Sequence, residues 1–75
     1  MGANQYIIKT NDARIFQSYD SIIAIKCGPM VILDKNDWDY SRTTGKYRNQ
    51  FLNENKAITE RKIKTGEYMI ADLNK

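Results

Sequence analysis

Four short runs rich in β-branched and aromatic residues follow one another within the first 33 residues of the chain. They occupy residues 6–10, 14–19, 22–27 and 30–33. Such side chains favour strands, and the residues between the runs, among them Asn11, Asp12, Gly28 and Pro29, favour turns. Because parallel neighbours need a crossover of a dozen residues or more, strands joined this closely must be antiparallel. The sequence therefore predicts an antiparallel meander over residues 6–33.

A change of hydrophobic period marks the end of this meander. Beyond Asp37, side chains at spacings of four, three and four residues fall on one stripe of a helix. The stripe consists of Tyr40, Thr44, Tyr47 and Phe51. Ser41, Thr43 and Thr44 are equally good N-cap candidates, because each hydroxyl can accept from a backbone N–H of the first turn. The pattern predicts a helix that ends near Leu52 and packs its stripe on the sheet.

A shorter helix and a final strand complete the predicted fold. Residues 57–64 read as a helix with Gly66 as its C-cap, and residues 68–73 as a strand with alternate side chains on one face. Strands, then helices, then a returning strand are typical of an α+β fold. We therefore predict a single domain over residues 1–75, with a small antiparallel sheet of four to five strands and one or two helices packed on one face. Residues 1–4 are expected to be disordered or a cloning scar, and the other sheet face to be wet or to meet a second copy.

The chain lacks the side chains of ordinary catalytic and zinc sites. It contains no histidine and one cysteine, which excludes the usual zinc ligand sets and leaves hydroxyl or thiol nucleophiles without a base. Cys27 follows an apolar run, so we expect a buried, inert thiol. Asp34, Asp37 and Asp39 do not fit a calcium loop, which requires glycine and glutamate where this chain has Asp39 and Gly45. We expect a solvated acidic turn there, no enzyme activity, no metal and no cofactor.

No apolar run approaches the roughly 20 residues that cross a bilayer. The N-terminus also lacks the basic and then apolar pattern of a signal peptide. We therefore expect a cytoplasmic protein with no membrane partner.

Positive charge is concentrated in residues 42–64, which carry seven basic and two acidic side chains and so a net charge of +5. The rest of the chain carries five basic and seven acidic side chains, a net charge of −2. Such a segment suits nucleic acid or an acidic protein patch, or is simply the solvated face of the helices. Aromatic residues among the cations would either stack on bases, anchor a protein partner or belong to the core. The candidate partner-binding residues are Trp38, Tyr40, Arg42, Lys46, Arg48, Asn49, Lys56, Arg61 and Lys62.

Two segments resemble a known group of proteins. The first is Ser18-Tyr19-Asp20-Ser21-Ile22-Ile23-Ala24, and the second is Asp39-Tyr40-Ser41-Arg42-Thr43-Thr44-Gly45-Lys46-Tyr47, ending in Phe51-Leu52. They are similar to segments of short proteins from bacteriophages and mobile elements of low-GC Gram-positive bacteria. The resemblance covers residues 14–53. This chain has Gly45 where serine is common and Tyr47 where many members carry histidine, so a role that requires the histidine does not carry over.

Members of that group are mostly of unknown function, so the resemblance implies a non-enzymatic domain. The size and the basic, aromatic helix also resemble a growth-inhibitory protein of a Twort-type staphylococcal phage, which binds the host DNA polymerase sliding clamp. We therefore expect a phage-encoded protein of host takeover, acting as a homodimer, that inhibits a host macromolecule such as the sliding clamp or another DNA-replication component. The alternatives are a small basic nucleic-acid-binding protein and a structural or interaction module of a phage complex.

Overall fold

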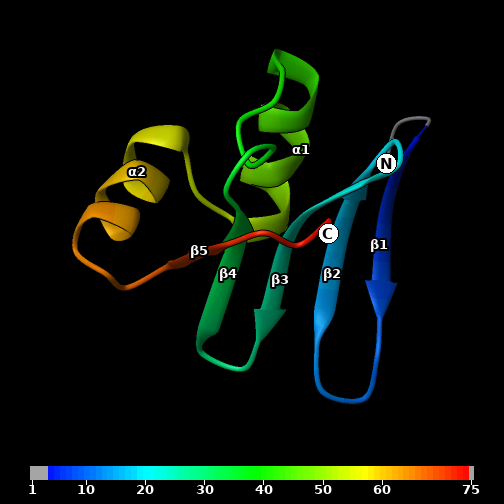
Figure 1. Cartoon of the computed structure of the whole chain (residues 1–75), viewed down its shortest axis with the longest axis horizontal. Helices are drawn as coiled ribbons and strands as arrows, with labels where there is room; N and C mark the ends of the chain where they lie inside the picture. The colour runs from blue at the N-terminus through cyan, green and yellow to red at the C-terminus, as the bar shows by residue number, and fades with distance from the viewer. Residues whose placement is uncertain (1–3, 75) are drawn as a thin grey trace.

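A computed structural model describes residues 4–74 of the chain. These residues form a five-stranded mixed sheet and two α-helices, which confirms the predicted α+β class (Figure 1). The elements are β1 (Gln5–Lys9), β2 (Arg14–Ser18), β3 (Ser21–Cys27), β4 (Met30–Asp34), α1 (Arg42–Leu52), α2 (Lys56–Lys64) and β5 (Met69–Ala71). The expectation of disorder or a cloning scar falls on residues 1–3, outside the described residues, and on Asn4, whose carbonyl oxygen accepts the backbone N–H of Tyr19 at 2.7 Å.

The first four strands form the predicted antiparallel meander, in the spatial order β1-β2-β3-β4. A turn at Gly28 and Pro29 joins β3 to β4, and Gly28 takes the positive φ of +58° that the first turn residue of a type II′ hairpin requires. The β2–β3 ladder shifts register between Phe16 and Gln17. This bulge leaves Ile23 without a partner on β2, and its side chain joins the core at 1% exposure.

The last strand departs from the prediction of an all-antiparallel sheet. β5 pairs with β4 in parallel, with Ile32 opposite Met69 and Asp34 opposite Ala71. The connection between these two strands contains both helices, so it is long enough for the crossover that a parallel pair requires. The prediction of an antiparallel sheet is therefore wrong for β5, because no short turn joins this strand to β4.

The chain beyond β5 is tied to the ends of β3 and β4. The backbone N–H of Leu73 donates to Asp34 Oδ1 at 2.8 Å. The side-chain amide of Asn74 accepts the N–H of Ile22 at 2.6 Å and donates to the Ile22 carbonyl oxygen at 3.0 Å. These contacts explain why the strand ends at Ala71, short of the predicted residue 73.

Asp34 closes the turn that follows β4. Its Oδ2 accepts the backbone N–H groups of Asn36 and Asp37 at 3.1 and 2.7 Å, in addition to the Leu73 contact. Burial alone would raise the pKa of Asp34, but the hydrogen bonds from Leu73, Asp37 and Asn36 outweigh it and hold the pKa below its ordinary value of 3.8. The prediction of a solvated acidic turn is wrong at Asp34, which is 1% exposed.

One face of the sheet packs against α1 to form the core. Phe16 of β2 stacks on Phe51 of α1 with ring centroids 5.8 Å apart. Trp38, Tyr47 and Ile63 are partly buried at the margin of this cluster. The buried apolar residues are Phe16, Ile23, Ala24, Val31, Leu33, Phe51, Leu52 and Tyr68. The core therefore takes side chains from only one side of the sheet.

Both predicted helices are confirmed. Ser41 is the N-cap of α1 among the three candidates, since its Oγ accepts the backbone N–H of Thr44 at 3.1 Å. Thr44 and Phe51 are buried as the stripe predicts, but Tyr40 precedes the helix and is 68% exposed, so its assignment to the stripe is wrong. Within residues 4–74, neither helix is long and apolar enough to cross a membrane.

Cys27 is exposed, so the prediction of a buried thiol is wrong. It is the last residue of β3, paired with Met30 next to the Gly28 turn. Its register position lies on the sheet face opposite to the one that α1 covers, because its neighbour Lys26 is paired with the core residue Val31.

Candidate functional site

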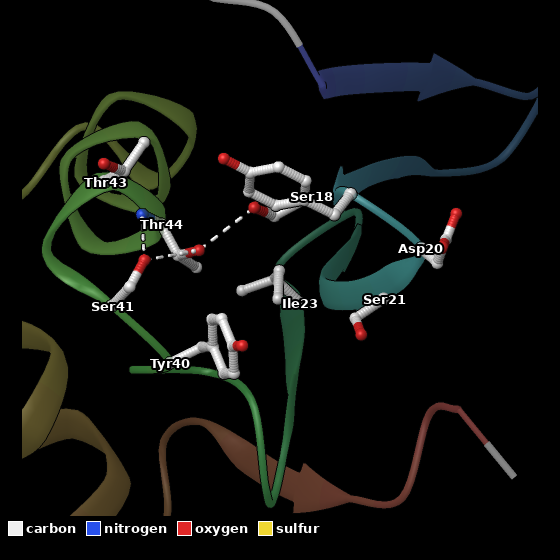
Figure 2. Close-up of a pocket in the computed structure, with 9 residues that line it drawn as sticks. Ser18, Asp20, Ser21, Ile23, Tyr40, Ser41, Thr43 and Thr44 are labelled. Carbon is white, nitrogen blue, oxygen red and sulfur yellow. Dashed lines mark hydrogen bonds between the residues drawn. The ribbon is translucent and has the colours of Figure 1, made fainter.

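The β2–β3 turn and the first turn of α1 enclose a hollow of about 490 Å³ (Figure 2). Its walls are Ser18, Tyr19, Asp20, Ser21, Ile23, Tyr40, Ser41, Thr43 and Thr44. Ser18 and Thr44, which meet here, are 26 residues apart in the chain. The fold thus brings together the two segments on which the sequence resemblance rests.

A chain of three hydroxyl groups holds the two walls of the hollow together. The Oγ atom of Ser18 and the Oγ1 atom of Thr44 are hydrogen-bonded at 3.0 Å, and the Ser41 hydroxyl donates to the same Thr44 oxygen at 3.2 Å. Ser18 and Thr44 are buried, at 3% and 0% exposure. Since buried polar groups are costly unless paired, these contacts fix the start of α1 against β2.

Two exposed tyrosines flank the hollow. Tyr19 is 51% exposed on the β2–β3 turn, and Tyr40 is 68% exposed immediately before the N-cap of α1. Arg42, the first residue of α1, is also exposed and forms no ion pair within residues 4–74. Large aromatic rings and a free guanidinium are therefore presented to solvent around a hollow whose lining residues mostly carry hydroxyl groups.

Tyr19 has a backbone conformation that side chains with a Cβ atom avoid. Its φ of +56° lies in the left-handed region, where the equivalent turn residue of the next hairpin is Gly28. The turn is held by the Tyr19 N–H bond to Asn4 and by the Gln17 side chain, which donates to the Tyr19 carbonyl oxygen at 2.8 Å. Such strain at an exposed position is typical of a side chain retained for function.

Replacing Tyr19 by glycine is expected to raise the free energy of unfolding by about 1 kcal/mol, because the left-handed conformation costs a residue with a Cβ roughly that much. Urea denaturation measures the change. The reverse substitution in the other turn, Gly28→Ala, is the matched control and should lower stability, since a Cβ there meets no atom within 4 Å and only the backbone strain acts. No gain for Tyr19→Gly would show that this turn is unstrained.

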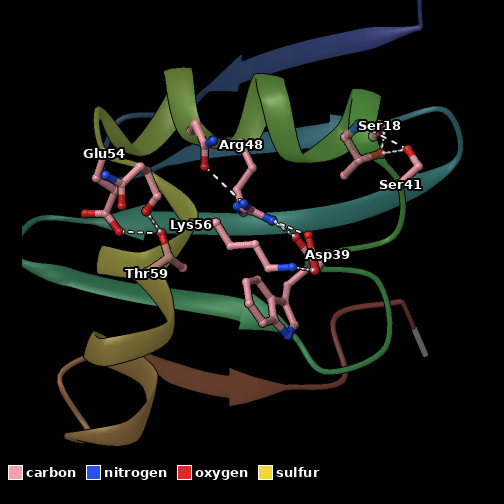
Figure 3. Close-up of polar contacts among 11 residues, drawn as sticks. Ser18, Asp39, Ser41, Arg48, Glu54, Lys56 and Thr59 are labelled. Carbon is pink, nitrogen blue, oxygen red and sulfur yellow. Dashed lines mark hydrogen bonds and ion pairs between the residues drawn. The ribbon is translucent and has the colours of Figure 1, made fainter.

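Arg48 is not a surface cation, contrary to its inclusion among the predicted partner-binding residues. It is 1% exposed and donates to the Trp38 carbonyl oxygen at 2.8 Å, to Asp39 Oδ1 at 3.1 Å and to Asn49 Oδ1 at 3.0 Å (Figure 3). Its guanidinium also lies 5.1 Å from the centroid of the Trp38 ring. Arg48 therefore ties the turn before α1 to the helix, and Trp38 and Asn49 are partners within the molecule.

Lys56 is held by the same turn. Its Nζ lies 2.6 Å from Asp39 Oδ2, across a groove of about 740 Å³ that follows one side of α1. Burial would raise the pKa of Asp39, but hydrogen bonds from Lys56 and Arg48 outweigh it and hold the pKa below its ordinary 3.8. The hydrogen bond to Asp39 also raises the pKa of Lys56.

Lys62 is engaged by Glu54, whose side chain is 6% exposed between the helices. Glu54 accepts from Thr59 at 2.6 Å, from Tyr68 at 2.8 Å and from Lys62 at 2.9 Å. Burial would raise the pKa of Glu54, but these hydrogen bonds outweigh it and keep the pKa below its ordinary 4.5. Of the nine predicted residues, Tyr40, Arg42, Lys46 and Arg61 remain exposed and outside any ion pair within the described chain.

Three cations that the sequence pattern missed lie side by side on the sheet. The register places Lys9 opposite Arg14 and Arg14 opposite Lys26, across β1, β2 and β3. The Arg14 guanidinium lies 5.7 Å from the centroid of the Phe51 ring, which puts this cationic row on the α1 side. Like charges directly opposite one another destabilise a sheet, so an anion bound there would relieve the repulsion.

Comparison with known proteins gives one assignment. Residues 1–67 match the profile of a family of unknown function, DUF8033. The chain belongs to this family. No curated protein and no solved structure shows a significant match.

The DUF8033 match spans every residue that lines the hollow and all three cations of the cationic row, and it ends before β5 begins. In this DUF8033 protein, the predicted binding residues do not include Ser18 and Tyr19, which line the hollow. The sequence does carry a signal for this site. Tyr19 is the first residue of the two-residue β2–β3 turn, a position that favours glycine. The cationic row carries no such signal, since its members meet only through strand register.

Proposed function

We propose that this protein is a non-enzymatic binding protein that recognises a protein partner through the hollow and its rim. The observation that carries the proposal is the pair of exposed tyrosines, Tyr19 and Tyr40, around a hollow built from two distant segments. Tyrosine and arginine are enriched among residues that dominate binding energy, and Arg42 stands next to this site. Within the described residues, no hydroxyl of the hollow donates to Asp20, its only carboxylate, so no activated nucleophile is assembled there.

The resemblance to short phage proteins supports a more specific version of this proposal. The protein would be encoded by a phage and act in the host cytoplasm, where it inhibits a component of DNA replication such as the sliding clamp. Arg42 and Lys46, both exposed on α1, favour a partner surface that is acidic where it meets the helix. Phe51 and Leu52 are buried in the core, so α1 would contact a partner through its exposed side chains and not through these apolar residues.

The double variant Tyr40→Ala/Arg42→Ala is expected to bind its partner at least about 30-fold more weakly, because two hot-spot side chains are lost. The measurement is affinity capture from a lysate of a low-GC Gram-positive host, followed by titration against the purified sliding clamp. Circular dichroism should show an unchanged fold. Arg61→Ala, exposed on α2, is the control, and a loss of binding there instead would place the interface on α2.

The cationic row favours a second candidate, direct binding of nucleic acid. Lys9, Arg14 and Lys26 lie on adjacent strands, with no ion pair to any described residue. Neighbouring strands are about 4.8 Å apart, so the three cations present a short line of charge to phosphates.

If this candidate is correct, affinity should fall roughly 40-fold for duplex DNA and roughly 20-fold for a single strand between 50 and 200 mM salt, the loss expected when three phosphates are neutralised. Replacing Lys9, Arg14 and Lys26 by glutamine should flatten the salt dependence, while Tyr40→Ala should leave it unchanged. Undetectable binding at low salt would eliminate this candidate. Failure of both binding tests would leave a structural or interaction module of a phage complex as the remaining proposal.

A further inference from the structure

A single row of apolar side chains crosses the whole sheet on the face opposite to α1. The register places Ile8 opposite Ile15, Ile15 opposite Ile25, Ile25 opposite Ile32 and Ile32 opposite Met69. Each of the five strands thus contributes one member to this isoleucine row. The alternate positions of the same strands, among them Ile7, Phe16, Ala24 and Leu33, pack in the core on the other face.

Among the described strand residues in register with the isoleucine row, the only charged one is Asp34, which is 1% exposed, so this face presents no strand charge to solvent. A second row beside it pairs Tyr6 with Gln17 and Gln17 with Ile22. The three strand cations of the cationic row lie on the α1 side instead. Ile8 and Met69, at the two ends of the isoleucine row, are 41% and 50% exposed. A contiguous apolar face of this kind marks an interaction surface.

We infer that this face is the interface of a homodimer, in which the isoleucine rows of two copies pack against each other. A two-fold interface uses the same patch twice, so an uncharged, continuous row is complementary to itself. Stacked sheets lie about 10 Å apart, which would leave the helices and cations of each copy on the outside of the dimer, beyond the roughly 10 Å range of charge repulsion in salt. This inference goes beyond the proposed function, because the hollow and α1 are not on this face.

The size of the face sets the expected strength of the dimer. Five strands about 4.8 Å apart and about 17 Å long present roughly 400 Å² in projection, and side-chain relief increases the accessible area. Specific interfaces begin near 600 Å² per partner, so the dimer is expected to dissociate in the micromolar range.

Sedimentation equilibrium of the full chain tests the inference. The mass should rise from 8.7 kDa at low concentration to about twice that value at high concentration. Ile25→Lys, at the centre of the row, should remain monomeric throughout. Ile25→Thr keeps a β-branched side chain, and should raise the dissociation constant at least tenfold while circular dichroism shows a folded protein.

A matched pair of substitutions separates this face from any other apolar surface. Ile8 and Ile70 are 41% and 40% exposed, but Ile70 is paired with the core residue Leu33 and so takes the register of the α1 side. Ile8→Lys should weaken the dimer at least tenfold, and Ile70→Lys should not. A wild-type monomer at about 500 µM, far above the expected dissociation constant, would overturn the inference. So would a dimer that is insensitive to Ile25→Thr and Ile8→Lys. The Tyr40→Ala/Arg42→Ala variant should still dimerise, so a failure of the partner-binding proposal can be distinguished from a failure of the dimer inference.

Discussion

Replacing Arg48 by methionine is expected to lower the free energy of unfolding by about 3 kcal/mol, because Arg48 is 1% exposed and its loss takes the donor from several acceptors, each costing about 1–3 kcal/mol where it is buried. The substitution preserves length but removes the donor from the Trp38 carbonyl oxygen, from Asp39 and from Asn49. Asp39 keeps Lys56, which limits the loss. Urea denaturation measures the effect, and in a chain whose core supplies roughly 3–5 kcal/mol the variant should be close to unfolding.

Arg42→Met is the control for this prediction. Arg42 lies on the same helix but is exposed and has no ion pair within the described residues, so its replacement should change stability by less than about 0.5 kcal/mol. Arg48→Lys should also be destabilising. A planar guanidinium donates to three acceptors at once here, and an ammonium group does not reproduce that arrangement of donors. Equal effects of Arg42→Met and Arg48→Met would contradict the structural role of Arg48.

The helix pattern could not identify Arg48 as buried. A helical stripe records which side chains face the sheet, whereas Arg48 is covered by the turn that contains Trp38 and Asp39 and folds back along α1. That covering depends on the path of the turn after β4, which Asp34 closes through bonds to Asn36 and Asp37. The meander and the helices could be predicted because residue alternation, helix caps and short connections depend on residues that are close in the sequence. The burial of one side of a helix depends instead on a distant part of the chain, which a local pattern does not record.

Strand register explains why the sequence did not reveal the cationic row or the isoleucine row. The two-residue β2–β3 turn pairs Ser18 with Ser21, and an uninterrupted ladder from there would place Arg14 opposite Ile25. The bulge after Phe16 shifts the ladder by one residue, so Arg14 meets Lys26 and Ile15 meets Ile25. One inserted residue thus decides which face of β3 is apolar. Neither the composition nor the hydrophobic period of the sequence shows where that residue is inserted.

Replacing Asp34 by asparagine is expected to lower the free energy of unfolding by about 3 kcal/mol at neutral pH, since hydrogen bonds to a charged acceptor contribute about 1.5–3 kcal/mol each. The amide would present a donor to at least one of the N–H groups of Leu73, Asp37 and Asn36, which now all donate to the carboxylate. The substitution is nearly isosteric, so packing is retained. Denaturation with urea at a series of pH values measures both the loss and its pH dependence.

The sign of that dependence follows from the lowered pKa of Asp34. A carboxyl whose pKa is lower in the folded state contributes stability that is complete above its ordinary pKa of 3.8 and is lost as the pH falls through the folded value. The gap between wild type and Asp34→Asn should therefore be largest near neutral pH and shrink in acid below 3.8. Asp39 and Glu54 titrate in both proteins, so their contributions cancel in the difference. Asp37→Asn is the control at neutral pH: the Asp37 side chain has no hydrogen bond within the described residues, so its replacement should change stability by less than about 0.5 kcal/mol. A gap for Asp34→Asn that stays constant into acid would show that the carboxylate charge does not stabilise this turn.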